Sequence, residues 1–339
     1  MKTTKRLFAA SMAALSGAAM AQSNVTISGL LDEFVAVHRS GGQNTYRLDS
    51  SGLAGSRLIF RGSEDLGSGL RANFFLENGF NADTGSQADA TRFFNRQAWV
   101  GLSSATLGEM KFGRLTSHQF FMEGQFDVFQ GATMGSSFNN LVQYTVRFDN
   151  AVGYTTPATL GPVKLHATYS LNEAATGRRM SAGMLAAEYK SGPLYLGANY
   201  ADVQNAATLV NTKTAFAGGN YTFSNAKVFA GYSQNKASNG SVDRQVFGVS
   251  GQYSVTPALA LAIGYARAND KTVTDADGSH VGIGFFYDLS KRTLLYGNVS
   301  KMNNSRTASY SLNGATALGV VPAVGNDVSG AQLGIRHLF

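Results

Sequence analysis

The sequence of 339 residues contains no cysteine. A disulfide scaffold and any thiolate site, whether metal-binding or nucleophilic, are therefore excluded, and non-covalent contacts alone must stabilise the fold. Long apolar runs are missing as well, because no stretch offers the roughly 18 consecutive apolar residues of a transmembrane helix. The chain is therefore not a helical membrane protein, and if it is exported it is either soluble or a membrane β-barrel.

Charge is sparse and evenly spread. Only 14% of the residues are charged, and the formal net charge of +7 comes without a basic cluster in the body of the chain, which gives little support to nucleic-acid binding. Catalytic signatures are missing too: the sequence has no G-x-S-x-G elbow, no H-E-x-x-H helix and no P-loop. Its five histidines show no metal-ligand spacing. We expect a protein that is not an enzyme and uses no metal or cofactor.

The N-terminus carries an export signal. The first 21 residues, "MKTTKRLFAASMAALSGAAMA", place three basic residues before a short apolar run that ends in Ala19-Met20-Ala21. This is the pattern of a secretory signal peptide with an A-x-A cleavage site. We expect residues 1–21 to be removed, so that the mature chain begins at Gln22 and residues 22–339 form one domain.

Short segments of the mature chain alternate between apolar and polar residues with period two. In "VKLHATYSL", every second residue from Val163 to Leu171 is apolar or aromatic, and the residues between are mostly polar. The composition of 39 glycines, 14 tyrosines and 22 phenylalanines suits closely spaced strands. Each alternation alone is weak evidence, but their number predicts a β-rich chain.

The connections between these segments alternate between two lengths. Seven are tight turns rich in Gly, Pro, Asn or Ser, among them "EDLGSG", "KSGP" and "FSNA". The connections between them are longer and polar, such as "NADTGSQADAT". Short turns at one end and long loops at the other are typical of outer-membrane barrels.

The pattern predicts sixteen strands. They begin near Val25, Ser56, Leu70, Arg92, Glu109, Val146, Val163, Ser181, Leu194, Lys213, Ala226, Asp243, Ala258, His280, Thr293 and Val328. An even antiparallel sheet can close on itself without exposed edges, and the final strand ends on the aromatic Phe339. The predicted fold is all-β, a 16-stranded antiparallel transmembrane β-barrel, wide enough to keep a water-filled lumen.

Tyrosines often stand at the ends of the apolar faces. They are Tyr189, Tyr200, Tyr221, Tyr253, Tyr265 and Tyr287. Tyrosine suits a membrane interface, with its ring in lipid and its hydroxyl among headgroups. A soluble β-sandwich with tyrosines at its rim is the alternative, but the export signal and the alternation of turn lengths favour the barrel.

One connection, residues 115–145 or nearly so, is far longer than the usual ~4 to 6 residues. It holds five phenylalanines, Phe120, Phe121, Phe126, Phe129 and Phe138. Because a solvated loop does not need such rings, we expect it to fold inward as the third loop of the barrel, bury them on the inner wall and narrow the lumen. It would carry Glu123 and Asp127 into that lumen. An outer loop packed over its neighbours is the alternative.

Arginines supply charge for the wall opposite this loop. Period two in "SRLIFRG" turns Arg57 and Arg61 inward, and three further arginines, Arg96, Arg114 and Arg147, begin or end strands near the loop. Arg96 has the same parity as the apolar residues Ala98, Val100 and Leu102 after it, so the pattern does not decide whether its side chain points into the lumen or outward. Arginine keeps its charge under all relevant conditions, so a ladder of arginines opposite two acids would set a field that selects ions. For any one of them, a surface arginine without a role is the alternative.

With these elements the chain resembles the general porins of Gram-negative outer membranes, in particular their beta-proteobacterial branch. The matching motifs are "VTISGLLD", "AGSRLIFRGSEDLGSGLRANFFLENGF", "FNRQAWVGLSSATLGEMKFGR", "RFDNAVGYTTP", "YDLSKRTLLYG" and "GIRHLF". The resemblance implies a homotrimer of 16-stranded barrels among the lipids and lipopolysaccharide of the outer membrane. Each barrel would hold a pore that the third loop narrows, open to passive diffusion of small hydrophilic solutes and ions.

The resemblance also implies roles for single residues. Basic wall residues, here Arg57, Arg96 and Arg147, would face acids of the loop, here Glu123 and Asp127. The proline-containing acidic motif usual in the loop is missing from "FFMEGQFDVFQG", which leaves the acids of the constriction open.

The C-terminus has a role in the same family. Phe339 would be part of the signal that the barrel-assembly machinery reads, and His337 stands where an aromatic residue is usual.

The basic wall predicts a channel with anion preference, and the sequence does not name a physiological solute. Five acids could offset this preference: Asp32, Glu77, Glu123, Asp127 and Asp149. A substrate-specific channel is the alternative, in which the inner aromatics Phe75, Phe229 and Phe286 would stack on a sugar. A structural or adhesive surface protein with an incidental pore is a third interpretation.

Overall fold

The computed structural model describes residues 24–173 and 180–339. The predicted signal peptide, residues 1–21, and the predicted first mature residue, Gln22, lie outside these ranges. Within them, no helix is both long and apolar enough to cross a bilayer. The described helices are short: α2 (His118–Gln125), α3 (Ser137–Leu141) and the 3₁₀ turn η1 (Ala158–Leu160).

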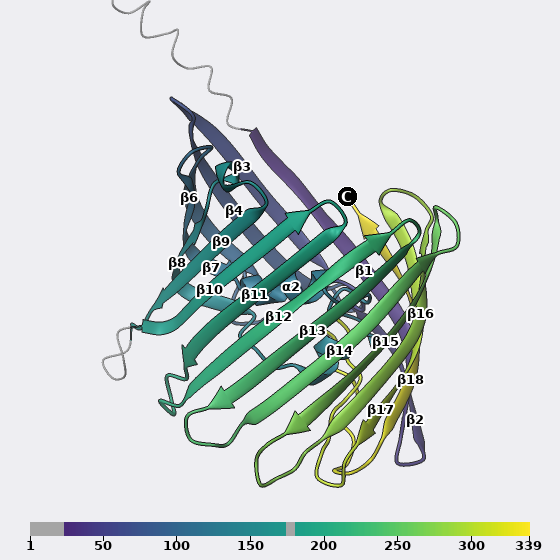
Figure 1. The fold of residues 1–339 in the computed structure, drawn as a ribbon. Coiled ribbons are helices and arrows are strands. Elements are labelled where there is room, and N and C mark those ends of the chain that lie inside the picture. Colours follow the sequence, from purple (N-terminus) through teal and green to yellow (C-terminus); the bar gives the residue numbers. More distant parts are fainter. Residues whose placement is uncertain (1–23, 174–179) are drawn as a thin grey trace, which may run out of the picture.

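Sixteen long strands of the described residues form one closed antiparallel barrel, as predicted (Figure 1). They are β1 (Asn24–Ser40), β3 (Arg57–Gly67), β4 (Leu70–Asn81), β6 (Gln97–Ser104), β7 (Gly108–Thr116), β8 (Arg147–Thr155), β9 (Val163–Leu171), β10 (Met180–Ser191), β11 (Leu194–Gln204), β12 (Asn211–Phe223), β13 (Ala226–Ala237), β14 (Asp243–Ser254), β15 (Leu259–Asp270), β16 (Gly278–Asp288), β17 (Thr293–Asn304) and β18 (Val328–Leu338). Two shorter strands belong to long loops: β2 (Gln43–Ser50) pairs with β1, and β5 (Ser86–Gln87) pairs with β4.

One strand starts later than the sequence predicts. β6 begins at Gln97 rather than near Arg92. Ahead of it the side chain of Asn95 replaces a strand carbonyl, because its Oδ1 accepts the backbone N–H of Gly79 at 2.7 Å. The segment therefore passes β4 as a loop, and Arg96 stands just before the strand instead of within it.

The first and last strands close the barrel. β1 pairs with β18 from Leu30 opposite Leu338 to Ser40 opposite Val328. The terminal Phe339 extends this seam, since its backbone N–H and C=O bond to Gly29 at 3.1 and 3.0 Å. Closure leaves no unpaired sheet edge between the first and last strands, which removes the usual site of edge-to-edge aggregation.

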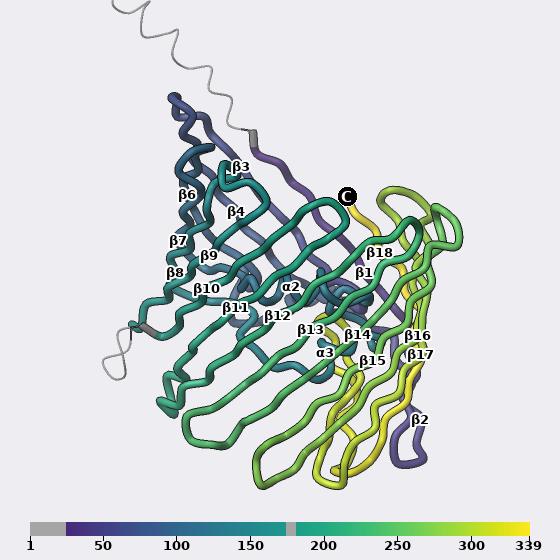
Figure 2. Tube along the Cα trace, in the orientation of Figure 1, coloured from purple at the N-terminus to yellow at the C-terminus, as the bar shows by residue number. Residues whose placement is uncertain are grey.

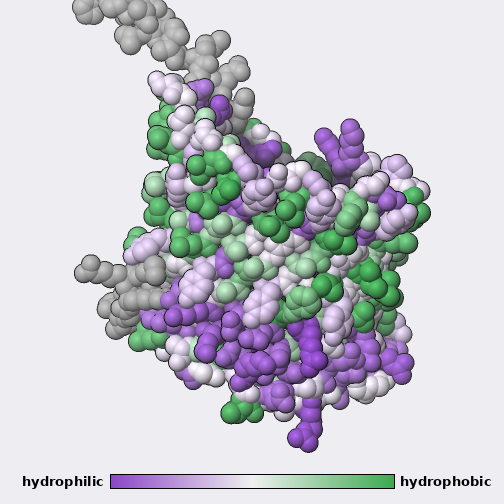
Figure 3. All heavy atoms as spheres, in the orientation of Figure 1, coloured by the Kyte–Doolittle hydropathy of each residue, from purple (hydrophilic) through white to green (hydrophobic). Residues whose placement is uncertain are grey.

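The outer wall is apolar and the inner wall is small or polar. On β15, for example, Leu261, Ile263 and Tyr265 are exposed on the outer wall. Ala262 and Ala266, which have the opposite parity on the same strand, are buried on the inner wall. Figure 3 shows apolar and weakly polar residues over the strands, and hydrophilic residues gathered toward the end that carries the long loops. So large an exposed apolar surface fits a lipid environment and would be a liability in water.

Tyrosines form part of a girdle near the short-turn end of this outer wall. Four exposed tyrosines stand near the ends of alternate strands, on β10, β12, β14 and β16: Tyr189, Tyr221, Tyr253 and Tyr287. Tyr200 and Tyr265, which the sequence also places at strand ends, lie further along their strands. Rings with a hydroxyl at this level suit the boundary between lipid tails and headgroups.

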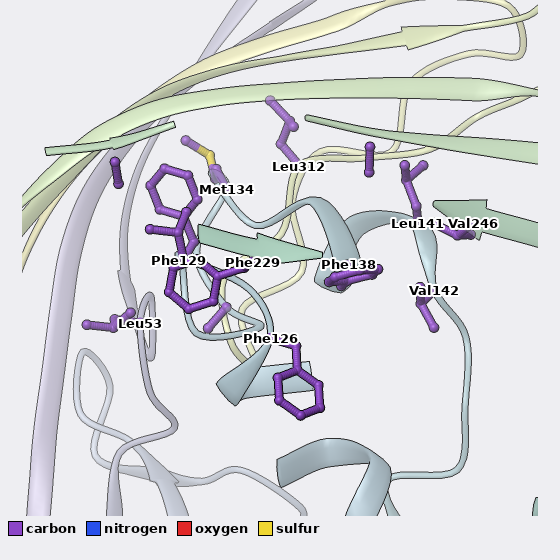
Figure 4. Packing of buried hydrophobic residues seen from close by; sticks show 14 of the residues in the cluster. Leu53, Phe126, Phe129, Met134, Phe138, Leu141, Val142, Phe229, Val246 and Leu312 are labelled. Carbon is purple, nitrogen blue, oxygen red and sulfur yellow. The ribbon is translucent and has the colours of Figure 1, made fainter. Parts of the chain in front are cut away.

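The third loop, residues 117–146, folds into the barrel as predicted (Figures 1 and 2). Phe126, Phe129 and Phe138 are at most 2% exposed and pack on the inner wall (Figure 4). Burial of such a ring stabilises the docked loop by about 1.5–3 kcal/mol. Phe120 is only half-buried, and Phe121 remains exposed.

Glycines on the inner wall form a seat for this loop, which we call the glycine track. Its first four members stand directly opposite one another on β11 to β14: Gly197, Gly218, Gly231 and Gly248. A Cβ at Gly197 would lie 2.9 Å from the ring of Phe126, and one at Gly231 would lie 2.6 Å from the ring of Phe138. The missing side chains therefore make the space that the two rings fill.

The eighth loop, residues 305–327, also folds inward, which the sequence analysis does not predict. Leu312 is fully buried in the cluster beneath the third loop. Asn139 of the third loop donates to the carbonyl of Gly314 at 3.0 Å, and the N–H of Ala315 donates to the carbonyl of Gly52 at 2.9 Å. The first loop (41–56), the third loop and the eighth loop are thus tied together inside the barrel.

Candidate pore constriction

A cavity of about 450 Å³ lies inside the barrel between the wall and the third loop. Three arginines, Arg57, Arg96 and Arg147, form its wall side. Neutral residues of the first, third and eighth loops, among them Leu53, Tyr144 and Thr316, form the other sides. No carboxylate residue lines this cavity among the described residues. We treat it as the candidate constriction of the lumen.

Glu77 holds two of the three arginines in place. Its Oε1 lies 2.9 Å from Nη1 of Arg57 and 2.9 Å from Nε of Arg96. Its Oε2 accepts a hydrogen bond from Gln97 Nε2 at 2.9 Å, and Glu77 itself is only 2% exposed. One buried carboxylate is therefore shared by two guanidinium groups, which leaves an excess of positive charge at the cavity.

Glycine makes room for these guanidinium groups. A Cβ at Gly55, in the first loop, would lie 2.6 Å from Nη1 of Arg96, and one at Gly79 would lie 3.1 Å from its Cδ. The carbonyl of Gly55 also accepts a hydrogen bond from Nε of Arg57 at 2.7 Å. The loop backbone thus positions both arginines, which settles the face of Arg96: it points to the cavity.

Arg147 has no such partner. It stands at the start of β8, and its Nε is buried without a hydrogen-bond partner. It forms no ion pair within the described ranges, although Arg57 and Arg96 are close enough to repel it. A buried N–H group without a partner is costly, so an anion in the cavity would satisfy this donor.

Arg114 lies outside the cavity. Its Nη1 forms an ion pair with Asp149, and its Nε donates to the carbonyl of Asn95 at 2.8 Å. Asp149 also pairs with Nη2 of Arg92 at 3.2 Å. This predicted constriction residue therefore belongs to a separate ion-pair group that ties β7 and β8 to the loop before β6.

Arg61 also lies outside the cavity. It follows Arg57 on the same face of β3 by four residues, about 13 Å along a strand. Its side chain is exposed and lines a separate cavity of about 390 Å³ toward the short turns. The structure therefore brings together three of the five predicted arginines.

The acids of the third loop do not line the cavity. Glu123 is 2% exposed within α2, where its carboxyl accepts hydrogen bonds from Gln119 Nε2 at 2.9 Å and from the hydroxyl of Tyr144. Burial raises the pKa of Glu123 to about 8, so the carboxyl is mostly protonated at neutral pH. The sequence places it opposite the arginines, whereas helical spacing of four lets Gln119 satisfy it within the loop.

Asp127 is equally buried and braces the turn after α2. Its carboxylate accepts hydrogen bonds from the N–H of Phe129 at 3.0 Å and from the hydroxyl of Ser136. Burial raises the pKa of Asp127 to about 6. An aspartate that bonds the backbone two residues ahead is a common turn device, and this local role explains why the residue does not face the lumen.

Sequence reasoning missed two residues that line the cavity, Tyr144 and Thr316, and the role of an acid beside it. Period two places Glu77 on the inward face of β4, but only the fold shows that Arg57 and Arg96 share its carboxylate. Tyr144 and Thr316 come from irregular backbone, and no periodicity indicates where a loop residue points. Their placement follows from the docking of the third and eighth loops.

Two of the histidines lie against each other in the barrel. Within the described ranges, no three His, Asp or Glu side chains stand together as metal ligands. His118 stacks on His166 at 3.6 Å between ring centroids, and burial together with His166 lowers the pKa of His118 to about 3. His118 therefore stays neutral.

The inner aromatics differ in their availability. Phe229 and Phe286 are buried in the cluster beneath the third loop and offer no free face to a solute. Phe75 is only half-buried and lies beside Trp99 on the wall. Two of the three rings considered for sugar stacking thus serve to seat the loop.

Known proteins share both sequence and fold with this chain. The profile of the protein family described as Gram-negative porin matches residues 9–307. Outer membrane porin protein 32 of Delftia acidovorans is 32% identical over 99% of both chains. The solved anion-selective porin from Comamonas acidovorans is 28% identical, covers 94% of this chain and 100% of its own, and superposes with a TM-score of 0.80. OmpT of Vibrio cholerae in its trimer form is 16% identical, covers 94% of this chain and 99% of its own, and shares the fold with a TM-score of 0.72.

Proposed function

Because this chain belongs to the family of Gram-negative porins and is an outer membrane channel, we propose that its pore prefers anions and passes small hydrophilic solutes by passive diffusion. One observation carries the anion preference. The cavity beside the third loop is lined by three arginines and, among the described residues, by no carboxylate residue. The solved relative from Comamonas acidovorans is described as anion-selective, which agrees with this assignment.

The charge balance at the cavity supports the same preference. Arg57 and Arg96 share the single charge of Glu77, and Arg147 has no acid partner in the described chain. Guanidinium groups stay protonated at any pH of interest. Charge rings in a narrow passage with low-dielectric walls raise the local concentration of the opposite ion. The neutral, buried carboxyl of Glu123 adds no compensating field.

We also propose that the barrel acts without catalysis and without a resident cofactor. The buried acids beside the cavity and in the third loop are engaged within the protein, Glu77 with two arginines and Asp127 with the backbone of its own loop. Passive diffusion needs only a water-filled passage and the charge on its walls, and the cavity with its three arginines supplies both.

Assembly into a homotrimer among outer membrane lipids and lipopolysaccharide is a further part of the proposal. The exposed apolar wall of β1, which includes Val25, Ile27 and Val35, is suited to contact with lipid or with another barrel. The relative from Vibrio cholerae is described in a trimer form.

Phe339 is proposed as the residue that the barrel-assembly machinery reads. Its ring is exposed and lies over Gly29, where a Cβ would come within 2.5 Å of it. We expect Phe339→Ala to lower the amount of folded protein in the outer membrane severalfold while refolding in detergent stays within about twofold. Equal losses in both assays would assign the ring to the seam rather than to recognition.

Reversal potential in a planar bilayer tests the anion preference. Arg147→Gln removes one charge from the cavity, and Arg267→Gln removes the same charge from an exposed position on β15 that does not line the cavity. We expect Arg147→Gln to lower the chloride-to-potassium permeability ratio by up to about fivefold, from the ~1 kcal/mol of one charge at 4 Å in water. Arg267→Gln should leave the ratio unchanged, and equal effects of the two variants would refute the role of the cavity.

A further inference from the structure

A row of side chains crosses the inner wall on the short-turn side of the constriction. The registers of β1, β3, β4, β6 and β7 place its members opposite one another in turn: Thr26, Arg61, Phe75, Trp99 and Gly113. Arg61 and Phe75 have the same parity as Arg57 and Glu77 on their strands, so the row faces the lumen. It borders the cavity of about 390 Å³.

Two aromatic rings form the centre of this row. Phe75 and Trp99 are parallel within 7°, with their ring centroids 5.8 Å apart. Both are half-buried, and neither belongs to the cluster that the third loop covers. The next position in the row is Gly113, so no side chain stands beside the indole there. The wall thus presents aromatic surface to water, which favours a ligand with a ring of its own.

Cations flank the two rings. Arg61 stands next to Phe75 in the row, is exposed, and forms no ion pair within the described ranges. Nζ of Lys111 lies 4.6 Å from the ring centroid of Trp99 and 2.9 Å from Oε2 of Glu109. Glu109 is the acid that lines this cavity, and its charge is already paired with Lys111. The free charge of the cavity is therefore that of Arg61.

We propose that this row is a binding site for small aromatic carboxylates, with the ring on Phe75 and Trp99 and the carboxylate on Arg61. A guanidinium group offers a planar pair of donors that matches a carboxylate. The volume lies at the small end of the ~300–1,000 Å³ that ligand pockets span. The hydrogen-bonding side chains of Ser63 and Asn73 border the same cavity.

The site is separate from the constriction and goes beyond sieving by charge. Arg61 is about 13 Å along β3 from Arg57. The proposed site is connected to the constriction through Gln97, whose Oε1 accepts a hydrogen bond from Trp99 Nε1 at 3.3 Å and whose Nε2 donates to Glu77. An anion that has passed the arginines therefore meets the row next, and an aromatic one is retained there.

The single tryptophan makes the site directly observable. Trp99 is the only tryptophan in the sequence, so emission of the full mature protein in detergent, excited at a wavelength that its tyrosines do not absorb, reports on this row alone. We would titrate it with benzoate, cyclohexanecarboxylate, acetate and glucose at constant ionic strength, with free N-acetyltryptophanamide as the reference for collisional quenching. We expect a saturable change with benzoate, at least tenfold weaker binding of acetate, and no saturable change with glucose. Linear quenching equal to that of the reference would overturn the proposal, as would acetate binding as tightly as benzoate.

Two variants separate the contributions of charge and ring. Arg61→Gln should weaken benzoate binding at least fivefold, and Phe75→Leu, which keeps an apolar side chain, should weaken it at least threefold. Arg267→Gln, which removes the same charge from the outer wall, should leave it unchanged. A far-UV circular dichroism spectrum identical to wild type would show that each variant keeps its barrel. Benzoate binding that survives both substitutions in a folded barrel would contradict the assignment.

Ion flow gives a second readout. Benzoate added on the short-turn side should reduce chloride current saturably in the wild type and at least fivefold less effectively in Arg61→Gln. The fluorescence titration needs no ion flow, so its outcome stands even if the anion preference of the constriction fails. Block of equal strength in both proteins would place benzoate elsewhere in the lumen and overturn the site.

Discussion

Glu77 decides the geometry of the constriction at the scale of single residues. It accepts hydrogen bonds from Arg57, Arg96 and Gln97, and its side chain is more deeply buried than that of either arginine. Removal of the Glu77 carboxylate would destabilise the fold, because both guanidinium groups would lose their acceptor. The residue thus fixes the cations that the pore uses and limits their net charge.

Glu77→Gln should therefore change selectivity and stability in opposite directions. We expect a higher chloride-to-potassium permeability ratio, since the negative charge beside the cavity arginines is removed, together with a loss of about 3–5 kcal/mol in stability from the broken buried pair. Reversal potential and thermal unfolding by circular dichroism measure the two effects. Glu64→Gln, an exposed residue of β3, is the control. A fall in anion preference in the Glu77 variant would contradict this account.

Glu123 gives the third loop a pH dependence. Its pKa of about 8 in the folded protein lies above the ordinary value of 4.5, so the folded state binds the extra proton between these two values. The contribution of Glu123 to the stability of the docked loop is therefore fully present below about pH 4.5, and it is lost as the pH rises from there through 8. Asp127, whose pKa is raised to about 6, acts with the same sign over a lower range.

Glu123→Gln should remove most of this dependence. Hydrogen exchange of peptides that cover α2, corrected for the intrinsic effect of pH, would measure it between pH 5.5 and 9. We expect α2 to open more easily at pH 9 in the wild type, and the difference between the two pH values to shrink in the variant. Wild-type exchange that slows toward pH 9 would show that the carboxyl is ionised in the folded loop.

At the scale of elements, the third loop and the wall that carries it form one structure. The glycine track continues on β15 and β16, where Gly264 stands opposite Gly282. A Cβ at Gly282 would lie 2.5 Å from the carbonyl oxygen of Gly135 and 2.8 Å from its Cα. Here the neighbour is loop backbone, which cannot rotate away as a side chain would.

Gly282→Ala should therefore lift the third loop from the wall. We expect a larger and less steady single-channel conductance and faster proteolysis within residues 117–146. Gly251→Ala on β14 is the matched control, because the nearest atom to its added Cβ is 3.9 Å away. A variant with wild-type conductance and protease resistance would mean that the loop accommodates the methyl group without moving.

The elements also show what the sequence could predict. Period-two alternation and turn lengths located the strands, because a barrel with lipid outside and water inside imposes that pattern on each of them. Phe126, Phe129 and Phe138 indicated the inward loop, because buried rings need a surface. Glu123 and Asp127 could not be placed in the same way: both are satisfied locally, and only the packed loop reveals it. The inward eighth loop left no comparable signal, since Leu312 is the only fully buried large side chain among residues 305–327 and small residues such as Ala315 and Ala317 make further contacts with the cluster.

At the scale of the whole molecule, the barrel combines an apolar outer wall, a closed seam and an asymmetric lumen. The packed third and eighth loops fill the side of β11 to β18, while Arg57, Arg96 and Arg147 stand on the side of β3 to β8. The passage between them is therefore bounded by charge of one sign on one side and by neutral polar and apolar groups on the other. This arrangement gives the molecule its predicted preference for anions.

The reversal potential of the wild-type mature protein under a KCl gradient tests this account most directly. Planar-bilayer recordings at neutral pH, where the three arginines are charged and Glu123 is mostly protonated, should give a potential shifted toward the equilibrium potential of chloride. A potential at zero, or one shifted toward that of potassium, would contradict the assignment of the arginine cavity as the selective constriction.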